Sequence, residues 1–132
     1  QNVPQWLIAT GVVWEGVDLT ADQLEVLVIA KLPFQEIQSP YNLIRYQRDE
    51  RAGGNSFNDI ALPEAVMRFA QGVGRLIRTQ HDRGLVITLD SRIVDRSYGK
   101  QFVNTFPQRM PVKVIESEQL TAEITNFFKS KR

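Results

Sequence analysis

Short runs of apolar, mostly branched residues alternate along this chain with segments of helical character. Continuous apolar runs are typical of strands buried on both faces of a parallel sheet, whereas half-exposed strands alternate apolar and polar residues. Strands that alternate with helices predict an α/β fold with a mainly parallel sheet flanked by helices. The expected strands are residues 6–13, 24–32, 85–89 and 112–115.

Among the expected helices, the one that opens at Leu62-Pro63 has the clearest pattern. Proline suits a first helical turn. An apolar stripe at helical spacing follows it, made of Val66, Phe69, Ala70, Val73, Leu76 and Ile77. We expect this helix to continue to Arg78. The other expected helices are Pro40 to about Ala52, Ser97 to Thr105, and a last helix capped by Ser117 with Leu120, Ile124 and Phe127 or Phe128 on its inner face.

Composition excludes several classes of site. The chain has 132 residues, which suggests one domain, and no cysteine and only one histidine, so no metal site is expected. The 16 Lys and Arg residues nearly balance 15 Asp and Glu residues, so an anion-binding surface must come from local clustering. No apolar run is long enough to span a membrane and the start does not resemble a signal peptide, so we expect a cytoplasmic piece of a larger protein.

The segments that follow the expected strands are polar or turn-like. The first strand leads into residues 14–18, the second into residues 31–34 and the third into residues 90–92. Ligands of open parallel sheets bind beyond the carboxyl ends of the strands. We therefore expect the ligand site along this edge of the sheet.

The helix that opens at Leu62 also carries a polar face. Arg68, Gln71, Arg75 and Arg78 are spaced three, four and three residues apart, which places them on one side of a helix, and no acid interrupts them. Stacked like charges cost stability, so this face suggests an anionic partner. The alternative is that the helix bends or ends there and the arginines pair with acids elsewhere in the fold.

Two glycines interrupt the same helix. Gly72 and Gly74 each cost about 1 kcal/mol relative to alanine in a helix interior. Close approach of another backbone or of a phosphate would explain both of them. A bend or an early end of the helix is again the alternative.

Residues 71–78, Gln-Gly-Val-Gly-Arg-Leu-Ile-Arg, resemble helicase motif VI in the form Q-x-x-G-R-x-x-R. Residues 82–84 and 90–92 then resemble the D-x-G and D-x-R of the DinG/XPD family, and residues 9–19 resemble its motif V with an E-G-[VI]-D core. Residues 31–34 and 62–66 are similar to that family's linking segments. The chain thus resembles the second RecA-like motor domain of DinG/XPD-like superfamily 2 DNA helicases, truncated at its amino end.

The resemblance implies an ATP site shared with a first motor domain, which would bind most of the ATP and magnesium. Arg78 would be the arginine finger, Arg75 a second contact to the γ-phosphate or to the opposing domain, and Gln71 would orient the nucleotide or the attacking water. Asp18 would accept a hydrogen bond from the ribose or position an arginine. Gly16 would permit the sharp turn beside Asp18, and Gly74 close approach to the nucleotide.

The same resemblance implies contact with single-stranded DNA. Thr10 and Gly11 would contact the DNA backbone, as motif V does in such motors. Arg45 and Arg48, with Tyr41 on the same side of their helix, are further candidates, because single-strand binders combine basic grooves with aromatic stacking. The alternative for this arginine pair is a solvated face near Asp49 and Glu50.

The resemblance therefore implies an ATP-dependent DNA helicase whose partners are single-stranded DNA and its own N-terminal motor domain. No G-x-x-x-x-G-K-[ST] phosphate loop occurs in the sequence, so we expect the isolated chain to hydrolyse no ATP. Two alternatives stay open: a helicase-like module of an ATP-regulated exonuclease, and a non-catalytic α/β domain whose arginine face docks an acidic protein.

Overall fold

The computed structural model describes residues 26–79 and 81–130. The strand predicted at residues 6–13 and the motif V segment lie outside the described residues. The roles predicted for Thr10, Gly11, Gly16 and Asp18 therefore stay predictions.

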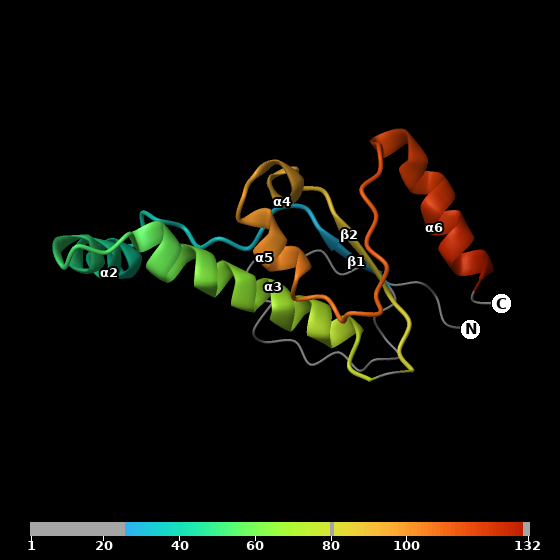
Figure 1. Ribbon diagram of the computed structural model, residues 1–132, viewed down its shortest axis with the longest axis horizontal. Coiled ribbons are helices and arrows are strands. Elements are labelled where there is room, and N and C mark those ends of the chain that lie inside the picture. Colours follow the sequence, from blue (N-terminus) through green and yellow to red (C-terminus); the bar gives the residue numbers. More distant parts are fainter. Residues whose placement is uncertain (1–25, 80, 131–132) are drawn as a thin grey trace.

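The sheet of the described part pairs two of the predicted strands. Strand β1 (Val26–Ile29) lies parallel to β2 (Leu85–Thr88), with Val26 opposite Leu85 and Ile29 opposite Thr88. The connection between them carries helix α2 (Pro40–Arg51), the π-helix η1 (Phe57–Ala61) and helix α3 (Leu62–Leu76) (Figure 1). The predicted α/β fold with a parallel sheet flanked by helices is confirmed.

Helix α2 begins and ends where local chemistry predicts. The Ser39 hydroxyl accepts the backbone N–H of Asn42 at 3.3 Å, and Pro40 occupies the first turn. Beyond the helix, Gly53 adopts a positive φ of 87°, which glycine tolerates without strain. The turn at Gly53 connects α2 to η1. Figure 1 shows α2 at one end of the long axis of the molecule, away from β1 and β2.

Helix α3 carries the centre of the core. Its stripe of Ala65, Phe69 and Val73 is buried against Ile29 at the end of β1 and Phe102 of α5 (Gly99–Val103). The Phe69 and Phe102 rings meet edge to face, with centroids 5.3 Å apart, a favourable aromatic geometry. The apolar stripe predicted for this helix is therefore its packing face.

Helix α3 ends at Leu76, so the prediction that it continues to Arg78 is wrong. Ile77 has extended backbone angles (φ −122°, ψ 94°), although its N–H still donates to the Val73 carbonyl at 3.1 Å. The Asp82 carboxylate takes the backbone N–H groups of Arg78 and Thr79, which would otherwise point back along the helix. A side chain at Gly84 would collide with Leu76, so the returning chain also packs closely against the helix end.

The part of the chain after β2 differs from its prediction. The helix expected over residues 97–105 is α5, which spans only Gly99–Val103. A further short helix, α4 (Arg92–Asp95), precedes it and was not predicted. The two pack so closely that a side chain at Gly99 would collide with the Ile93 backbone. Residues 112–115 form no strand in the described structure, and Val114 is 76% exposed. The strand prediction there is wrong, because β-branched residues favour a strand only where a neighbouring strand and a packed face receive them.

The last helix, α6 (Leu120–Lys129), follows a 3-10 turn, η2 (Ser117–Gln119). Glu116 caps this turn in a reciprocal capping box with Gln119, so the prediction that Ser117 is the cap is wrong. Leu120, Ile124 and Phe127 are half-buried while Phe128 is exposed, which selects Phe127 for the inner face. No helix of the described residues has the length and apolar character to cross a membrane.

An aspartate ties together the exits of the two strands. The Asp90 carboxylate, after β2, accepts the Leu32 backbone N–H at 2.9 Å, and it pairs with Arg92 through Nε at 2.9 Å and Nη2 at 2.6 Å. The guanidinium of Arg92 also lies over the Phe34 ring, 5.3 Å from its centroid. The hydrogen bond from Arg92 lowers the pKa of Asp90 from 3.8 to about 2, against the opposing effect of burial.

Truncating Phe69 is expected to destabilise the core. Phe69→Ala should lower the free energy of unfolding by about 3–5 kcal/mol, because Phe69 is fully buried and its loss leaves a cavity. Met67→Ala on the same helix is the matched control: Met67 is 54% exposed and should change stability by less than about 1 kcal/mol. Urea unfolding measures both values, and equal effects would contradict the assigned packing face.

Replacing Asp90 is expected to have a pH-dependent effect. Because the folded-state pKa of about 2 lies below the ordinary 3.8, the carboxylate stabilises the fold above about pH 4 and loses this effect as the pH falls toward 2. Asp90→Asn should cost about 1–2 kcal/mol at pH 7, a range that allows for solvent screening of the partly exposed Arg92.

The difference between wild type and Asp90→Asn should be clearly smaller at pH 2.5 than at pH 7, and it should approach zero only as the pH falls below about 2. Urea unfolding of both proteins at pH 7 and pH 2.5 checks this. A difference in stability that does not change with pH would contradict the ionic role of Asp90.

Candidate functional site

The surface of α3 away from the core carries part of the predicted arginine face. Gln71 is exposed and Arg68 and Arg75 are half-buried, whereas Phe69 and Val73 between them are buried. Helical spacing thus separates this polar face from the packing face. The shared face predicted for Arg68, Gln71 and Arg75 agrees with the helix as observed.

Arg78 is also at the surface, but it lies on the turn after α3 and not on the helix. It lies past the end of α3 and is exposed, so its position depends on the turn that follows the helix and not on helical spacing. The Asp82 Oδ2 atom accepts the N–H of Arg78 at 2.8 Å and that of Thr79 at 2.6 Å. The bond from Thr79 and then that from Arg78 lower the pKa of Asp82, because both stabilise the charged carboxylate.

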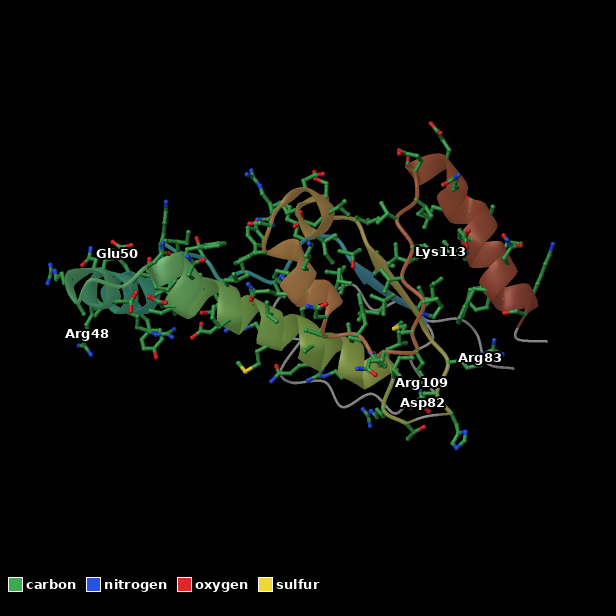
Figure 2. All side chains as sticks on the ribbon, in the orientation of Figure 1. Arg48, Glu50, Asp82, Arg83, Arg109 and Lys113 are labelled. Carbon is green, nitrogen blue, oxygen red and sulfur yellow. The ribbon has the colours of Figure 1, made fainter. Side chains whose placement is uncertain are left out.

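Figure 2 shows Asp82 beside the carboxyl-terminal end of α3, close to Arg109 in this view. Sequence reasoning singled out Asp82 only as part of a motif and not as the group that holds Arg78. The available signal was an acid four residues after an arginine at a helix end, followed by a glycine at Gly84. That signal is weak, because carboxylates that accept backbone amides are common in turns.

The two helical glycines have different surroundings. Gly72 is buried on the packing side of α3. Gly74 is exposed, and apart from its two chain neighbours and the backbone of its own helix nearby, no atom of the described residues lies within 4 Å of where its Cβ would be. Close approach of an outside group at Gly74 therefore stays a prediction, and the described part of the structure leaves room for it.

The arginines do not lie at the edge of the sheet where the sequence predicts a ligand site. The carboxyl ends of β1 and β2 lead to residues 30–34 and 89–92, and the Asp90–Arg92 pair lies there. The turn that carries Arg78 runs instead from α3 to the amino end of β2 (Figure 1). The exits of β1 and β2 do share one edge, and a ligand site there stays a prediction. The arginines lie elsewhere, because a helix that returns to a parallel strand must deliver the chain to the amino end of that strand.

Arg45 of α2 is held within the fold. It pairs with Glu64 of α3, donates to the Asn42 side chain at 3.3 Å, and lies over the Tyr41 ring at 5.2 Å from its centroid. The hydrogen bond with Glu64 raises the pKa of Arg45. The acid that holds Arg45 is therefore Glu64 of another helix, and neither Asp49 nor Glu50, which the alternative interpretation named.

Arg48 is exposed, and Figure 2 shows Arg48 and Glu50 pointing away from α2 on different sides. A shallow hollow of about 360 Å³ lies between α2 and η1, and Arg48 and Asp49 contribute opposite charges to it; its lining is Arg45, Arg48, Asp49, Ala52 and Ile60. Burial, and then the charge of Asp59, raise the pKa of Asp49. Of the two arginines predicted to contact DNA, Arg48 is the more accessible.

Within residues 26–79 and 81–130, no group of three His, Cys, Asp or Glu side chains is placed to hold a metal ion. The cations on and after α3 suit an anion instead, since guanidinium groups match the geometry of phosphate oxygens.

Comparison with known proteins identifies the family. The profile of the helicase C-terminal domain family matches residues 2–109. The chain is 48% identical over 101 residues to the ATP-dependent DNA helicase YoaA of Haemophilus influenzae, which covers 76% of this chain and 16% of that protein. It is 43% identical over 104 residues to the ATP-dependent DNA helicase DinG of Photobacterium profundum, which covers 79% of this chain and 15% of that protein.

A third relative carries a different activity in its name. The chain is 38% identical over 112 residues to the 3′-5′ exonuclease DinG of Bacillus subtilis, covering 85% of this chain and 12% of that protein. The chain therefore spans less than a fifth of the length of each of these relatives. The match over residues 2–109 and these identities show that the chain belongs to the helicase C-terminal domain family, as a DinG-like superfamily 2 member.

Proposed function

We propose that this chain supplies motif V and the arginine side of an ATP site in a DinG-type, ATP-dependent DNA helicase. The observation that carries the proposal is the joint placement of Gln71 and Arg75 on the outer face of α3 and of Arg78 on the exposed turn directly after it. The names of the YoaA and Photobacterium DinG relatives, both ATP-dependent DNA helicases, support the same activity.

The chemistry asked of these residues is stabilisation of a phosphoryl-transfer transition state. Negative charge spreads over the equatorial oxygens of the transferred phosphoryl group, and an inserted guanidinium contributes roughly 10³–10⁵ to the rate in well-studied motors. Arg78 is proposed as this finger, Arg75 as a second contact to the γ-phosphate or to the opposing domain, and Gln71 as the group that orients the attacking water. ATP and magnesium would be held mainly by a first motor domain.

The location of Arg78 at the amino end of β2 agrees with an ATP site in which a first motor domain binds the nucleotide and this chain supplies the arginines. The rule that ligands lie at the carboxyl edge applies to a ligand that a sheet's own loops bind. A residue that reaches a nucleotide held by another domain needs only to lie on the surface that faces that domain. The exposure of Arg78 and Thr79 is compatible with such a surface, and within the described residues the space beside Gly74 leaves room for close approach.

The proposal includes residues outside the described part. Gly16 and Asp18 would border the nucleotide, while Thr10 and Gly11 would contact the backbone of single-stranded DNA. Arg48 is the proposed DNA contact on α2, whereas the charge of Arg45 is largely balanced by its pair with Glu64. The helicase would couple nucleotide-driven closure of the two motor domains to movement along the strand.

The relative from Bacillus subtilis favours one second candidate. That relative is named a 3′-5′ exonuclease, and the second candidate is therefore a nuclease whose helicase-like module responds to ATP. In that case ATP would change the rate of strand cutting, and unwinding of a duplex would not accompany ATP hydrolysis. An unwinding assay beside a cutting assay, with and without ATP, separates these two functions.

Removing the proposed finger is expected to abolish turnover. Arg78→Ala, in the protein that joins this chain to its first motor domain, should lower kcat for ATP by about 10³-fold or more while ATP binding changes by less than about tenfold. Arg96→Ala, an exposed arginine on the turn after α4, is the control and should keep wild-type turnover. Steady-state ATPase and nucleotide titration measure the two effects, and unchanged turnover would remove Arg78 from this role.

Removing the proposed DNA contact on α2 is expected to change the salt dependence of binding. Arg48→Ala should reduce the slope of log K against log salt for single-stranded DNA by about 0.7, the amount for one phosphate contact. Lys129→Ala, an exposed cation on α6, is the control and should leave the slope unchanged. Filter binding between 50 mM and 200 mM salt measures this slope. An unaltered slope in Arg48→Ala would show that Arg48 makes no phosphate contact and that DNA binds at another surface.

A further inference from the structure

We infer that Asp82 is a positioning residue that fixes Arg78 for its contact with the nucleotide. This inference rests on the proposed function, because it assigns Asp82 a part in the same ATP site. Asp82 acts on Arg78 through its backbone N–H and also through the attraction between the carboxylate and the Arg78 charge, and it takes no part in binding phosphate itself.

The geometry begins with the end of α3. After Leu76 the backbone of Ile77 is extended, so the helical hydrogen-bond ladder no longer fixes residues 78 and 79. Their N–H groups donate to one oxygen of Asp82 at 2.8 Å and 2.6 Å. The Thr79 hydroxyl in turn accepts the His81 N–H at 3.3 Å. The turn is therefore organised around a single carboxylate oxygen.

The charge of Asp82 supports a dedicated role. A carboxylate near the carboxyl-terminal end of a helix meets the negative end of the helix dipole, an unfavourable location. Asp82 nevertheless has a lowered pKa, because the bonds from Thr79 and Arg78 outweigh the opposing effect of burial. The local gain thus comes from holding these two amides, which is the function that we assign to the residue.

Gly84 completes the support. A Cβ at this position would collide with the Leu76 side chain, so the chain after Asp82 packs directly against the last buried residue of α3. This contact sets the distance between the helix end and Asp82. The D-x-G motif of residues 82–84 therefore holds the turn that carries Arg78 at two points, through the hydrogen bonds to Asp82 and through the packing of Gly84 on Leu76.

Arg75 and Arg78 consequently depend on different supports. Arg75 lies in the last turn of α3 and is fixed by the helix, whereas Arg78 is fixed by Asp82. Loss of Asp82 should displace Arg78 and leave Arg75 in place. A displacement of about 1 Å in a catalytic group costs on the order of 100-fold in rate.

The test uses the protein that joins this chain to its first motor domain. Asp82→Ala should lower kcat by about 10- to 100-fold and leave KM for ATP within about threefold, because ATP is bound mainly elsewhere. Asp82→Asn keeps an oxygen that accepts the same amides, so it should recover part of the lost kcat. Asp95→Ala, an exposed acid of α4, is the matched control and should keep wild-type kcat and KM.

A double-variant cycle separates positioning from general stability. If Asp82 acts through Arg78, adding Asp82→Ala to Arg78→Ala should cause no further fall in kcat. Multiplying losses, or an unchanged kcat in Asp82→Ala while Arg78→Ala is impaired, would overturn the inference. If Asp82→Ala does not fold, the same cycle is run with Asp82→Asn.

Amide hydrogen exchange gives a readout that needs no activity. The amides of Arg78 and Thr79 should exchange slowly in the wild type and faster in Asp82→Ala, while the amides of α2 remain unchanged. Fast exchange of both amides in the wild type would overturn the inference by itself. An inactive wild type with slow exchange would instead reject the proposed function and retain Asp82 as the support of this turn.

Discussion

Burial of one face of α3 against the end of β1 and against α5 determines where every other feature of this structure lies. Phe69 and Val73 are removed from water between Ile29 and Phe102, and this apolar contact fixes the rotation of the helix about its axis. Side chains on opposite faces of a helix keep a fixed angle about its axis. The same rotation that buries Phe69 therefore directs Gln71 outward and leaves Arg75 at the boundary of the core. A helix rotated otherwise would bury guanidinium groups at a large desolvation cost.

Two aspartates complete the frame by holding backbone at the two ends of β2. Asp82 accepts amides from the turn that enters the strand, and Asp90 accepts the Leu32 amide beside the point where the strand ends. Both have a lowered pKa, because hydrogen bonds to the charged carboxylate outweigh burial. The two motif segments that follow residues 71–78 therefore have structural roles. Residues 82–84 support the turn after α3, and residues 90–92 support the exits of the two strands.

This frame gives the two ends of the sheet different characters. At the carboxyl edge, Arg92 is satisfied by Asp90 and by the Phe34 ring, so it stabilises the fold locally. At the amino end of β2, the turn presents Arg78 at the surface, as the proposed contact with a first motor domain requires. Helix α2, joined to α3 through the Arg45–Glu64 pair, extends the molecule away from both ends.

The sequence by itself determined the α/β class, β1, β2 and the packing stripe of α3, because continuous branched runs and helical apolar spacing are local patterns that burial reinforces. It also supplied the motif that identifies the family. The tertiary structure decided the rest. Among the described residues no strand lies beside residues 112–115. Helix α3 ends where the Asp82 carboxylate competes for its amides, and Arg45 takes its partner from another helix. Each of these outcomes depends on which groups folding brings close together: a neighbouring strand, the Asp82 carboxylate or the Glu64 carboxylate. The spacing of residues along the chain does not specify these tertiary contacts.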